Sequence, residues 1–394
     1  MKLRFAEGTI VRNVLYSIAL GGCFPVKAAE ILGYKVTIQR IIRRMRDEKY
    51  VLYYDVPCRC VTLSSYGVKK LKEISLERYE HYNQTNQSGN SYVFSGLKND
   101  NIDEMRKARR MIYQSEILCM LDSLGVSCWL FDKPELTVQN KNQVITKNDS
   151  IYYTSIELKG VDQRKQESKY QHTRCYGLLF CPGGIYMVYN VGAGKIDWNK
   201  YGENKMLLHA EDIVTHNYVT TGKYEIKDAI LYIKNYSLLA EILSASENKN
   251  AKRKYEFLSF DNNFENMYCI PVDIFGKMVT QLLLLPDHHK LILDYVFKDD
   301  DYNRNVNEYI DCDAKKNDEY YFSFLECNIS RLKNIKLAMS FDPNLSYKYH
   351  IFCYQWQVDM LKEYIPQDVH LHIINEQNLL EYAITVSYTH LTLP

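Results

Sequence analysis

The chain has 394 residues, of which 46% are hydrophobic and 25% charged, so its composition excludes a disordered or collagen-like protein and allows two or three folded domains. Its net charge of +1 excludes a polycation as a whole, and we expect neither a signal peptide nor a membrane span, since no apolar run approaches roughly 20 residues. The 11 cysteines are scattered without zinc spacing, which favours reduced thiols, no bound metal and a cytoplasmic protein.

The first segments of the chain have the pattern of a winged helix-turn-helix. Pro25 is suited to the first turn of a helix because its missing N–H costs no hydrogen bond there, and Gly33 suits a tight turn after that helix. The expected elements are a packing helix over 9–18, a helix over 25–32, a third helix over 36–48, wing strands at 50–54 and 59–63, and a capped return helix over 64–71. In this arrangement the third helix enters the major groove of DNA.

The third helix is expected to be amphipathic. Ile38, Ile41, Ile42 and Met45 recur at the spacing of one helix face, which predicts an apolar stripe toward the core. Basic and amide side chains lie off that stripe, and such groups suit guanine and adenine edges or phosphates. The candidate DNA-binding residues are Lys35, Gln39, Arg40, Arg43, Arg44 and, from the wing, Arg59.

Positive charge is concentrated in this region. Residues 1–78 contain 15 Lys and Arg against 7 Asp and Glu, a net charge of +8 in a chain whose total is +1. A basic module on an otherwise acidic chain is typical of a surface that binds phosphates. The alternative is a winged helix that contacts proteins, with its arginines as a solvated face.

The chain beyond residue 78 is expected to be a mixed α/β protein. Residues 79–103 include a Gly-, Ser- and Asn-rich stretch and are interpreted as a linker. Helical and strand-like patterns then alternate over 104–235, which indicates an α/β domain, and again over 236–385, which indicates an α/β C-terminal region. Residues 386–394 match the translation of a sequencing adapter, so we expect an artefact there and a truncated C-terminal region.

The middle domain contains one constellation with catalytic potential. Glu157 and Lys159 are expected on a strand, where a Glu-x-Lys spacing puts both side chains on one face. In nucleases of the PD-(D/E)xK type, the Glu and an upstream Asp hold Mg²⁺ and the Lys steadies the attacking water. Candidates for the upstream acid are Asp132 and Asp149, with Glu116 as a further carboxylate and Gln166 and Tyr170 as a following pair. The alternative is an ordinary ion pair on an exposed strand.

The N-terminal module, with Val61-Thr62-Leu63-Ser64-Ser65-Tyr66-Gly67 after its wing, resembles the winged helix of the replication-relaxation family. These are plasmid and conjugative-element proteins in which a winged helix precedes a domain similar to restriction endonucleases. The resemblance covers residues 9–75 well, 104–235 loosely, and the rest not at all. It implies binding of double-stranded DNA and a role in replication, transfer or regulation of a mobile element.

The sequence therefore favours a sequence-specific DNA-binding protein whose α/β remainder serves dimerisation or contacts with mobile-element proteins. Under this interpretation we expect no catalysis and no cofactor. One alternative is a metal-dependent nuclease, the only case in which Mg²⁺ is expected. Another is a protein-interaction scaffold whose winged helix does not bind DNA.

Overall fold

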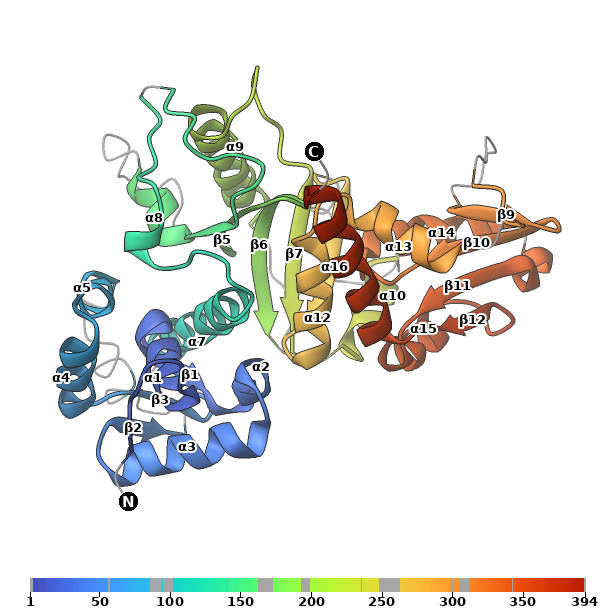
Figure 1. The fold of residues 1–394 in the computed structure, drawn as a ribbon. Coiled ribbons are helices and arrows are strands. Elements are labelled where there is room, and N and C mark those ends of the chain that lie inside the picture. The colour runs from blue at the N-terminus through green and yellow to red at the C-terminus, as the bar shows by residue number, and fades with distance from the viewer. Residues whose placement is uncertain are drawn as a thin grey trace. The chain divides into compact units, whose positions relative to one another are not determined.

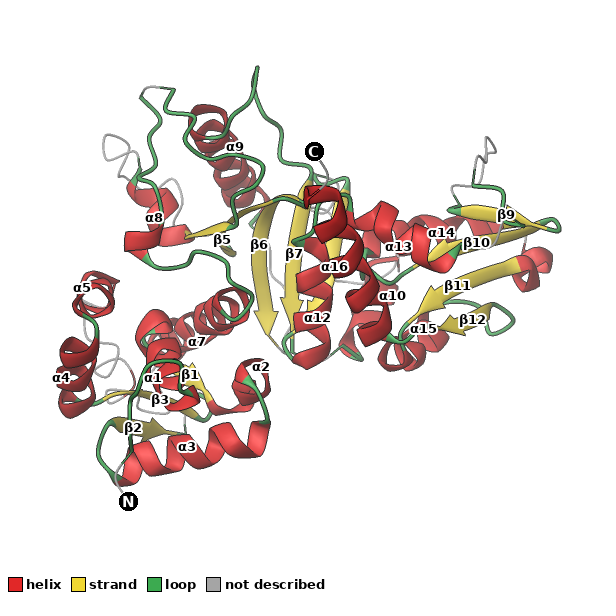
Figure 2. Ribbon diagram, in the orientation of Figure 1, coloured by secondary structure: helices red, strands yellow, loops and turns green. Residues whose placement is uncertain are grey.

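The computed structural model describes residues 3–55, 57–85, 94, 102–139, 141–161, 173–192, 199–234, 236–247, 263–298, 301–304, 312–341 and 343–392. The fold is α/β, as expected (Figures 1 and 2). It divides into two compact units, one formed by Met1–Glu135 with Val272–Lys277 and the other by Leu136–Pro271 with Met278–Pro394. Among the described residues, no helix is both long and apolar enough to cross a bilayer.

The first unit begins with helices and a small antiparallel sheet. Its elements in chain order are α1 (Ile10–Gly21), β1 (Phe24–Pro25), the 3-10 turn η1 (Val26–Ala28), α2 (Ala29–Leu32), α3 (Lys35–Asp47), β2 (Val51–Tyr54) and β3 (Cys60–Leu63). The strands are ordered β1-β3-β2, and β3 pairs antiparallel with both neighbours. The expected first helix, third helix and wing strands are therefore confirmed within a few residues of their predicted bounds.

The prediction of a helix that begins at Pro25 is wrong for its first residue. Phe24 and Pro25 form β1, opposite Val61 and Cys60 of β3, and the chain becomes helical only afterwards. A residue that precedes proline is pushed toward extended backbone, so Phe24 favours a strand. Pro25 lacks a donor, and the ladder continues one residue later where Val26 N–H donates to the Arg59 carbonyl over 2.9 Å.

Three further helices complete the first unit: α4 (Ser65–Ile74), α5 (Leu76–Thr85) and α7 (Ile102–Asp122). The α4 helix is capped as expected, because Gly67 N–H donates to the Ser64 hydroxyl over 3.0 Å. The α7 helix packs against α1, and Ser115 of α7 donates to the Cys23 carbonyl.

The observed division differs from the expected domains in two places. The helix expected to open the middle domain, α7, belongs to the first unit, and the division falls after Glu135 instead of within residues 79–103. The first residues of the expected linker continue α5, and most of the remainder lies outside the described residues. The regions 104–235 and 236–385 were expected to be separate, but from Leu136 onward they belong to one unit, apart from Val272–Lys277.

The second unit contains a five-stranded mixed sheet. Its strands, β4 (Ile151–Thr154), β5 (Cys175–Cys181), β6 (Gly184–Gly192), β7 (Asp228–Ile233) and β8 (Asn266–Pro271), lie in chain order. The β5 strand is antiparallel to β4 and β6, whereas β6, β7 and β8 are parallel. The connecting helices are α8 (Ser155–Gly160), α9 (Lys200–Asn217) and α10 (Leu238–Glu247).

A four-stranded sheet of order β12-β11-β10-β9 forms the other half of this unit. The strands and helices of this half are α12 (Ile274–Leu283), α13 (His288–Val296), β9 (Ala314–Lys316), β10 (Glu319–Ser323), α14 (Ile329–Phe341), β11 (Tyr349–Cys353), α15 (Val358–Tyr364), β12 (His370–Ile373) and α16 (Glu376–Thr392). The α12 helix begins in the first unit and enters the second at Met278. The β10, β11 and β12 strands are parallel, as expected for strands joined by helices. One continuous hydrophobic core spans both sheets, which explains why the unit is single. The α16 helix continues to Thr392, through the segment expected to be adapter-derived.

Replacing Gly67 with Ala is expected to destabilise the first unit. A Cβ at this position would collide with the Tyr50 carbonyl oxygen, which accepts the Ser64 N–H over 3.0 Å and joins the wing to α4. We expect Gly67→Ala to lower the free energy of unfolding by about 1–3 kcal/mol, the usual cost of overpacking. Urea unfolding of the full chain measures it. Gly160→Ala, where the added Cβ meets open space, is the matched control, and equal stability of both variants would contradict the predicted collision.

Candidate nucleic-acid interface

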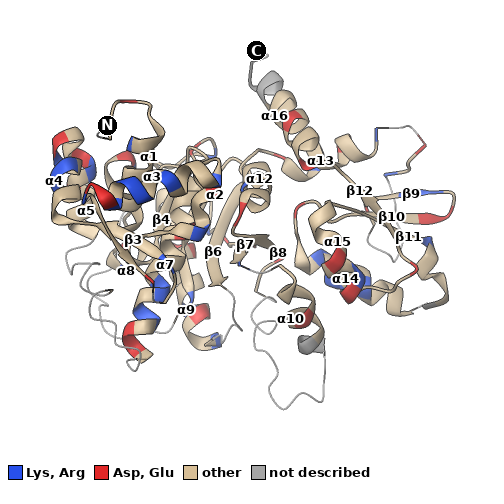
Figure 3. Ribbon diagram, turned by 90° about the horizontal axis from the view of Figure 1, so that it is seen from below, with Lys and Arg blue, Asp and Glu red and all other residues tan. Residues whose placement is uncertain are grey.

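The α3 helix has one buried and one exposed face. Ile38, Ile42 and Met45 are almost fully buried and Ile41 is 8% exposed, so the predicted apolar stripe is confirmed. The arginines lie off this stripe, and their side chains are exposed. Figure 3 shows basic positions recurring along the α3 ribbon. The exposed set is Arg40, Arg43, Arg44 and Arg46. Burial of the stripe thus fixes which side chains can reach an external ligand.

The N-terminal half of α3 and the turn of the wing enclose an open hollow of about 490 Å³. Three residues predicted to contact DNA, Lys35, Gln39 and Arg59, line it together, although Arg59 is at least 20 residues away from the other two in the sequence. Lys27 also lines the hollow, and the sequence analysis missed it. The positive charge of Lys27 can be seen in the sequence, but only the fold places this residue at the same hollow as Lys35.

The ion pairs of this surface are few and exposed. Lys35 Nζ lies 3.1 Å from Glu30, Arg44 lies 3.6 Å from Glu48, and Arg59 lies 3.6 Å from Asp55. Exposed pairs of this kind contribute only about 0–1 kcal/mol, so a phosphate can displace the carboxylate at little cost. Among the described residues, Arg40 and Arg43 form no ion pair at all. These two arginines are the cations most available to an external anion.

The nuclease candidates have a different structure from the one expected. Glu157 and Lys159 lie on helix α8 and not on a strand, so the predicted shared face is wrong. Residues two apart on a helix point about 200° from each other around the axis. Thr154 caps this helix: its hydroxyl accepts from Glu157 N–H over 3.4 Å, and Glu157 Oε2 accepts from Thr154 N–H over 2.7 Å. The Glu157 carboxylate is therefore part of a capping box.

The remaining nuclease candidates have other surroundings. Asp149 accepts hydrogen bonds from the backbone N–H and hydroxyl of Thr146 over 2.6 and 2.9 Å, which holds a turn before β4. Asp132 lies in a 3-10 turn of the first unit, whereas Glu157 is in the second, and Glu116 is buried on α7. Gln166 and Tyr170 lie outside the described residues. No group of three His, Cys, Asp or Glu side chains in the described part of the chain is already arranged around a metal position.

A buried charged cluster joins α13 to the segment after β10. Glu326 is 2% exposed, and its carboxylate lies 3.2 Å from His288 Nε2 and 2.9 Å from His289 Nδ1. His289 Nε2 lies 3.6 Å from Asp313, which also accepts from Arg331 over 2.6 Å. Sequence spacing gave no sign of this cluster, since its members come from three separate segments of the second unit.

The charges of this cluster stabilise one another. Burial alone would lower the pKa of His289, but hydrogen bonds to Asp313 and Glu326 raise it to about 9. Burial would raise the pKa of Glu326 and of Asp313, but their histidine and arginine partners hold both below the usual range. Both ring nitrogens of His289 face carboxylates, so the imidazolium links the segments of Asp313 and Glu326 by ion pairs. It is not placed to accept a proton from a substrate.

No known protein family matches this chain, and no curated protein or solved structure is significantly similar to it.

The His289 cluster predicts a loss of stability at alkaline pH. Because the folded pKa of His289, about 9, exceeds the ordinary value of 6.5, its contribution is fully present below pH 6.5 and lost as the pH rises through 9. The side chain is 42% exposed, so after a discount for solvent screening we expect about 1 kcal/mol. Chemical unfolding of the full chain at a series of pH values measures it, and His289→Gln should flatten the curve between those limits. An unchanged curve in the variant would show that His289 does not carry the effect.

The capping box of α8 predicts a structural role for Glu157. Glu157→Ala removes the acceptor of the Thr154 N–H, so we expect a loss of about 0.5–2 kcal/mol in unfolding free energy, as for other helix caps. Glu157→Gln retains an oxygen acceptor and should lose less. Urea unfolding distinguishes the two variants. If Glu157→Ala instead leaves stability unchanged but abolishes Mg²⁺-dependent DNA cleavage, the capping role is wrong and the nuclease interpretation returns.

Proposed function

We propose that the first unit binds double-stranded DNA, with α3 in the major groove and Arg59 of the wing turn on the phosphate backbone. The observation that carries this proposal is the pair Arg40 and Arg43, which are exposed on the face of α3 opposite its buried stripe and form no ion pair with any residue that the structure describes. At about 20 Å, α3 has a length and width that fit the major groove.

The order of elements supports a winged-helix interpretation of the first unit. A helix, a short strand, a helix pair and a two-stranded wing follow one another as α1, β1, α2, α3, β2 and β3, and β1 adds to the wing sheet beside β3. In winged helices the second helix of the pair reads base edges and the wing contacts the backbone. The hollow beside α3 brings Lys35, Gln39 and Arg59 into one such contact region.

The charge of the chain supports the same surface. The net charge of +8 over residues 1–78 contrasts with +1 for the whole chain, so the attraction for DNA is centred on the first unit. The proposed membership of the replication-relaxation family adds the context of a mobile element, in which such a protein would act in replication, transfer or regulation. We assign the base-reading role to Gln39, Arg40 and Arg43, since amide and guanidinium groups pair with purine edges.

The surroundings of Glu157 argue against the alternative of a metal-dependent nuclease. Glu157 serves a helix cap and is not on one face with Lys159, and the two strands that follow it, β5 and β6, contain no acidic residue. The second unit is instead a candidate for contacts with a second copy of the chain or with mobile-element proteins.

The test is binding of the full chain to duplex DNA, measured by fluorescence anisotropy across a salt series. With about 4–6 phosphate contacts, the logarithm of the affinity should fall against the logarithm of salt with a slope of about −4 to −5. Arg40→Ala/Arg43→Ala should weaken binding at least about tenfold and reduce the preference among duplex sequences, because these two side chains are assigned to base edges. Arg59→Ala should make the salt slope shallower by about 1, because it removes one phosphate contact, without changing which duplexes are preferred.

The matched control removes two exposed cations elsewhere. Lys147→Ala/Lys223→Ala lowers the net charge by the same amount but alters only the second unit, so its affinity and slope should equal those of the parent chain. Equal losses in both double variants would indicate a general charge effect and not an α3 surface. No binding at low salt would overturn the proposal and leave a protein-interaction role for the first unit.

A further inference from the structure

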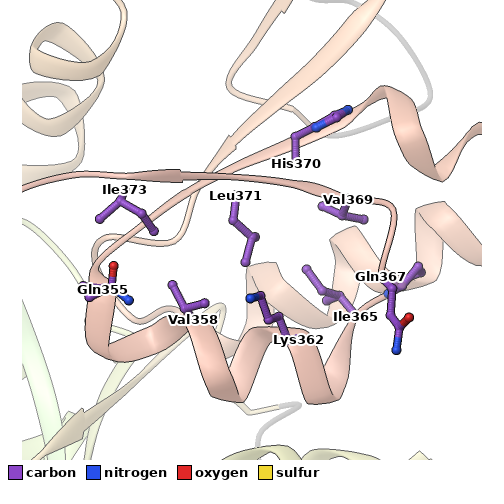
Figure 4. A pocket seen from close by; sticks show the side chains of 10 residues that line it. Gln355, Val358, Lys362, Ile365, Gln367, Val369, His370, Leu371 and Ile373 are labelled. Atoms are coloured by element: carbon purple, nitrogen blue, oxygen red, sulfur yellow. The ribbon is translucent and has the colours of Figure 1, made fainter.

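Three histidines share one face of the four-stranded sheet in the second unit. The β11 and β12 strands are parallel, with His350 opposite His370 and Phe352 opposite His372. Side chains two apart on a strand point the same way, so His350, His370 and His372 all project from this face. The opposite face of β12 packs on α15: Figure 4 shows Val369 and Leu371 toward α15 and His370 directed away from it.

Two of these imidazoles already face each other through ring nitrogens. His350 Nδ1 lies 2.8 Å from His372 Nε2, so one nitrogen donates a proton to the lone pair of the other. The third ring, His370, stacks beside His350 with centroids 4.8 Å apart. His350 is buried, His372 is half-buried and His370 is exposed, so the cluster opens toward solvent at the β12 edge.

The other nitrogen of His350 faces a carboxylate. Its buried Nε2 has no hydrogen-bond partner among the described residues, but Glu319 Oε2 lies 3.3 Å away in a contact that lacks hydrogen-bond alignment. Glu319 is itself held by Tyr321, whose hydroxyl donates to Oε2 over 2.9 Å. A carboxylate behind the far nitrogen of a histidine is the usual support of a metal ligand, because it fixes the ring and its tautomer.

We propose that this face binds one divalent transition-metal ion of the Zn²⁺ class, with His350 Nδ1, His372 Nε2 and His370 as ligands and Glu319 as the support of His350. The ion replaces the proton now shared by His350 and His372. Imidazole nitrogens bind such an ion at about 2.0–2.1 Å, which places two of them roughly 3.3 Å apart in a tetrahedral site. The present distance of 2.8 Å between His350 Nδ1 and His372 Nε2 therefore has to increase by about 0.5 Å when the ion binds.

The third ligand requires a side-chain rotation. Within the described residues, no three metal-binding side chains stand at coordination distance before the ion arrives. His370 is exposed, so its ring can change rotamer at small cost, whereas His350 is held by its neighbours in the sheet. Imidazole ligands favour Zn²⁺, Cu²⁺ and Ni²⁺ over Mg²⁺ and Ca²⁺, which prefer oxygen.

The test uses the untagged full chain, freed of metal with a chelator and titrated with Zn²⁺ against a chromophoric competitor. We expect one tightly bound ion per chain, and at least a roughly tenfold loss of affinity in His370→Ala/His372→Ala, since even a supporting residue is worth about 10–100-fold. Glu319→Gln should weaken binding by about tenfold without changing the stoichiometry. His216→Ala, on α9 of the same unit, is the matched control and should bind like the parent chain.

A second measurement distinguishes this site from the 11 cysteines of the chain. Co²⁺ bound by imidazole and water gives visible absorption bands without the intense near-ultraviolet band of a thiolate ligand. A thiolate band, equal Zn²⁺ affinity in the parent and the double variant, or no tight Zn²⁺ binding would each overturn the proposal. The variant His370→Gln/His372→Gln repeats the test with side chains closer in size to histidine than alanine is. Thermal unfolding of each variant without metal tests whether the sheet is intact.

Discussion

The burial of Ile38, Ile41, Ile42 and Met45 is the constraint on which the proposed DNA surface depends. A helix with an apolar stripe has one rotation about its axis that removes the stripe from water, at a gain of about 1.5–3 kcal/mol for each large side chain. That rotation leaves Arg40 and Arg43 exposed to solvent. The hydrophobic packing thus selects the charged face, and no separate interaction is needed to orient the arginines.

Local features of the first unit could be predicted because they depend on neighbouring residues. The stripe of α3, the Ser64 cap and the wing strands follow from spacing, capping chemistry and alternation. Phe24–Pro25 could not be assigned in this way, since β1 exists only through its pairing with β3. Glu157 was misassigned although its signal was local: Thr154 and Glu157 have the spacing of a capping box, a helix signal that was overlooked after the strand pattern of β4.

The candidate sites depend still more on tertiary structure. Lys35, Gln39 and Arg59 could be nominated by residue type, but their common hollow requires the turn that brings the wing beside α3. His370 and His372 are visible as a His-x-His pair, whereas His350 joins them only through the parallel register of β11 and β12. Glu326 and His289 likewise meet across segments that are far apart in the chain. Spacing within one element is readable in a sequence, and register between elements is not.

The two histidine clusters of the second unit show how the surroundings of an imidazole decide what it can do. At His289 both nitrogens face carboxylates, so the ring is held as a cation and neither nitrogen is left to bind a ligand. At His350 one nitrogen faces the Glu319 carboxylate and the other faces the His372 imidazole. The two imidazoles now share a proton, and the proposed metal ion would take its place between them. An ion at His350 would also add two positive charges to a part of the chain whose net charge is negative, residues 79–394 summing to −7 against the +8 of residues 1–78. Its binding would therefore be favoured by the same charge asymmetry that supports the proposed DNA binding by the first unit, although the two proposed sites share no residue.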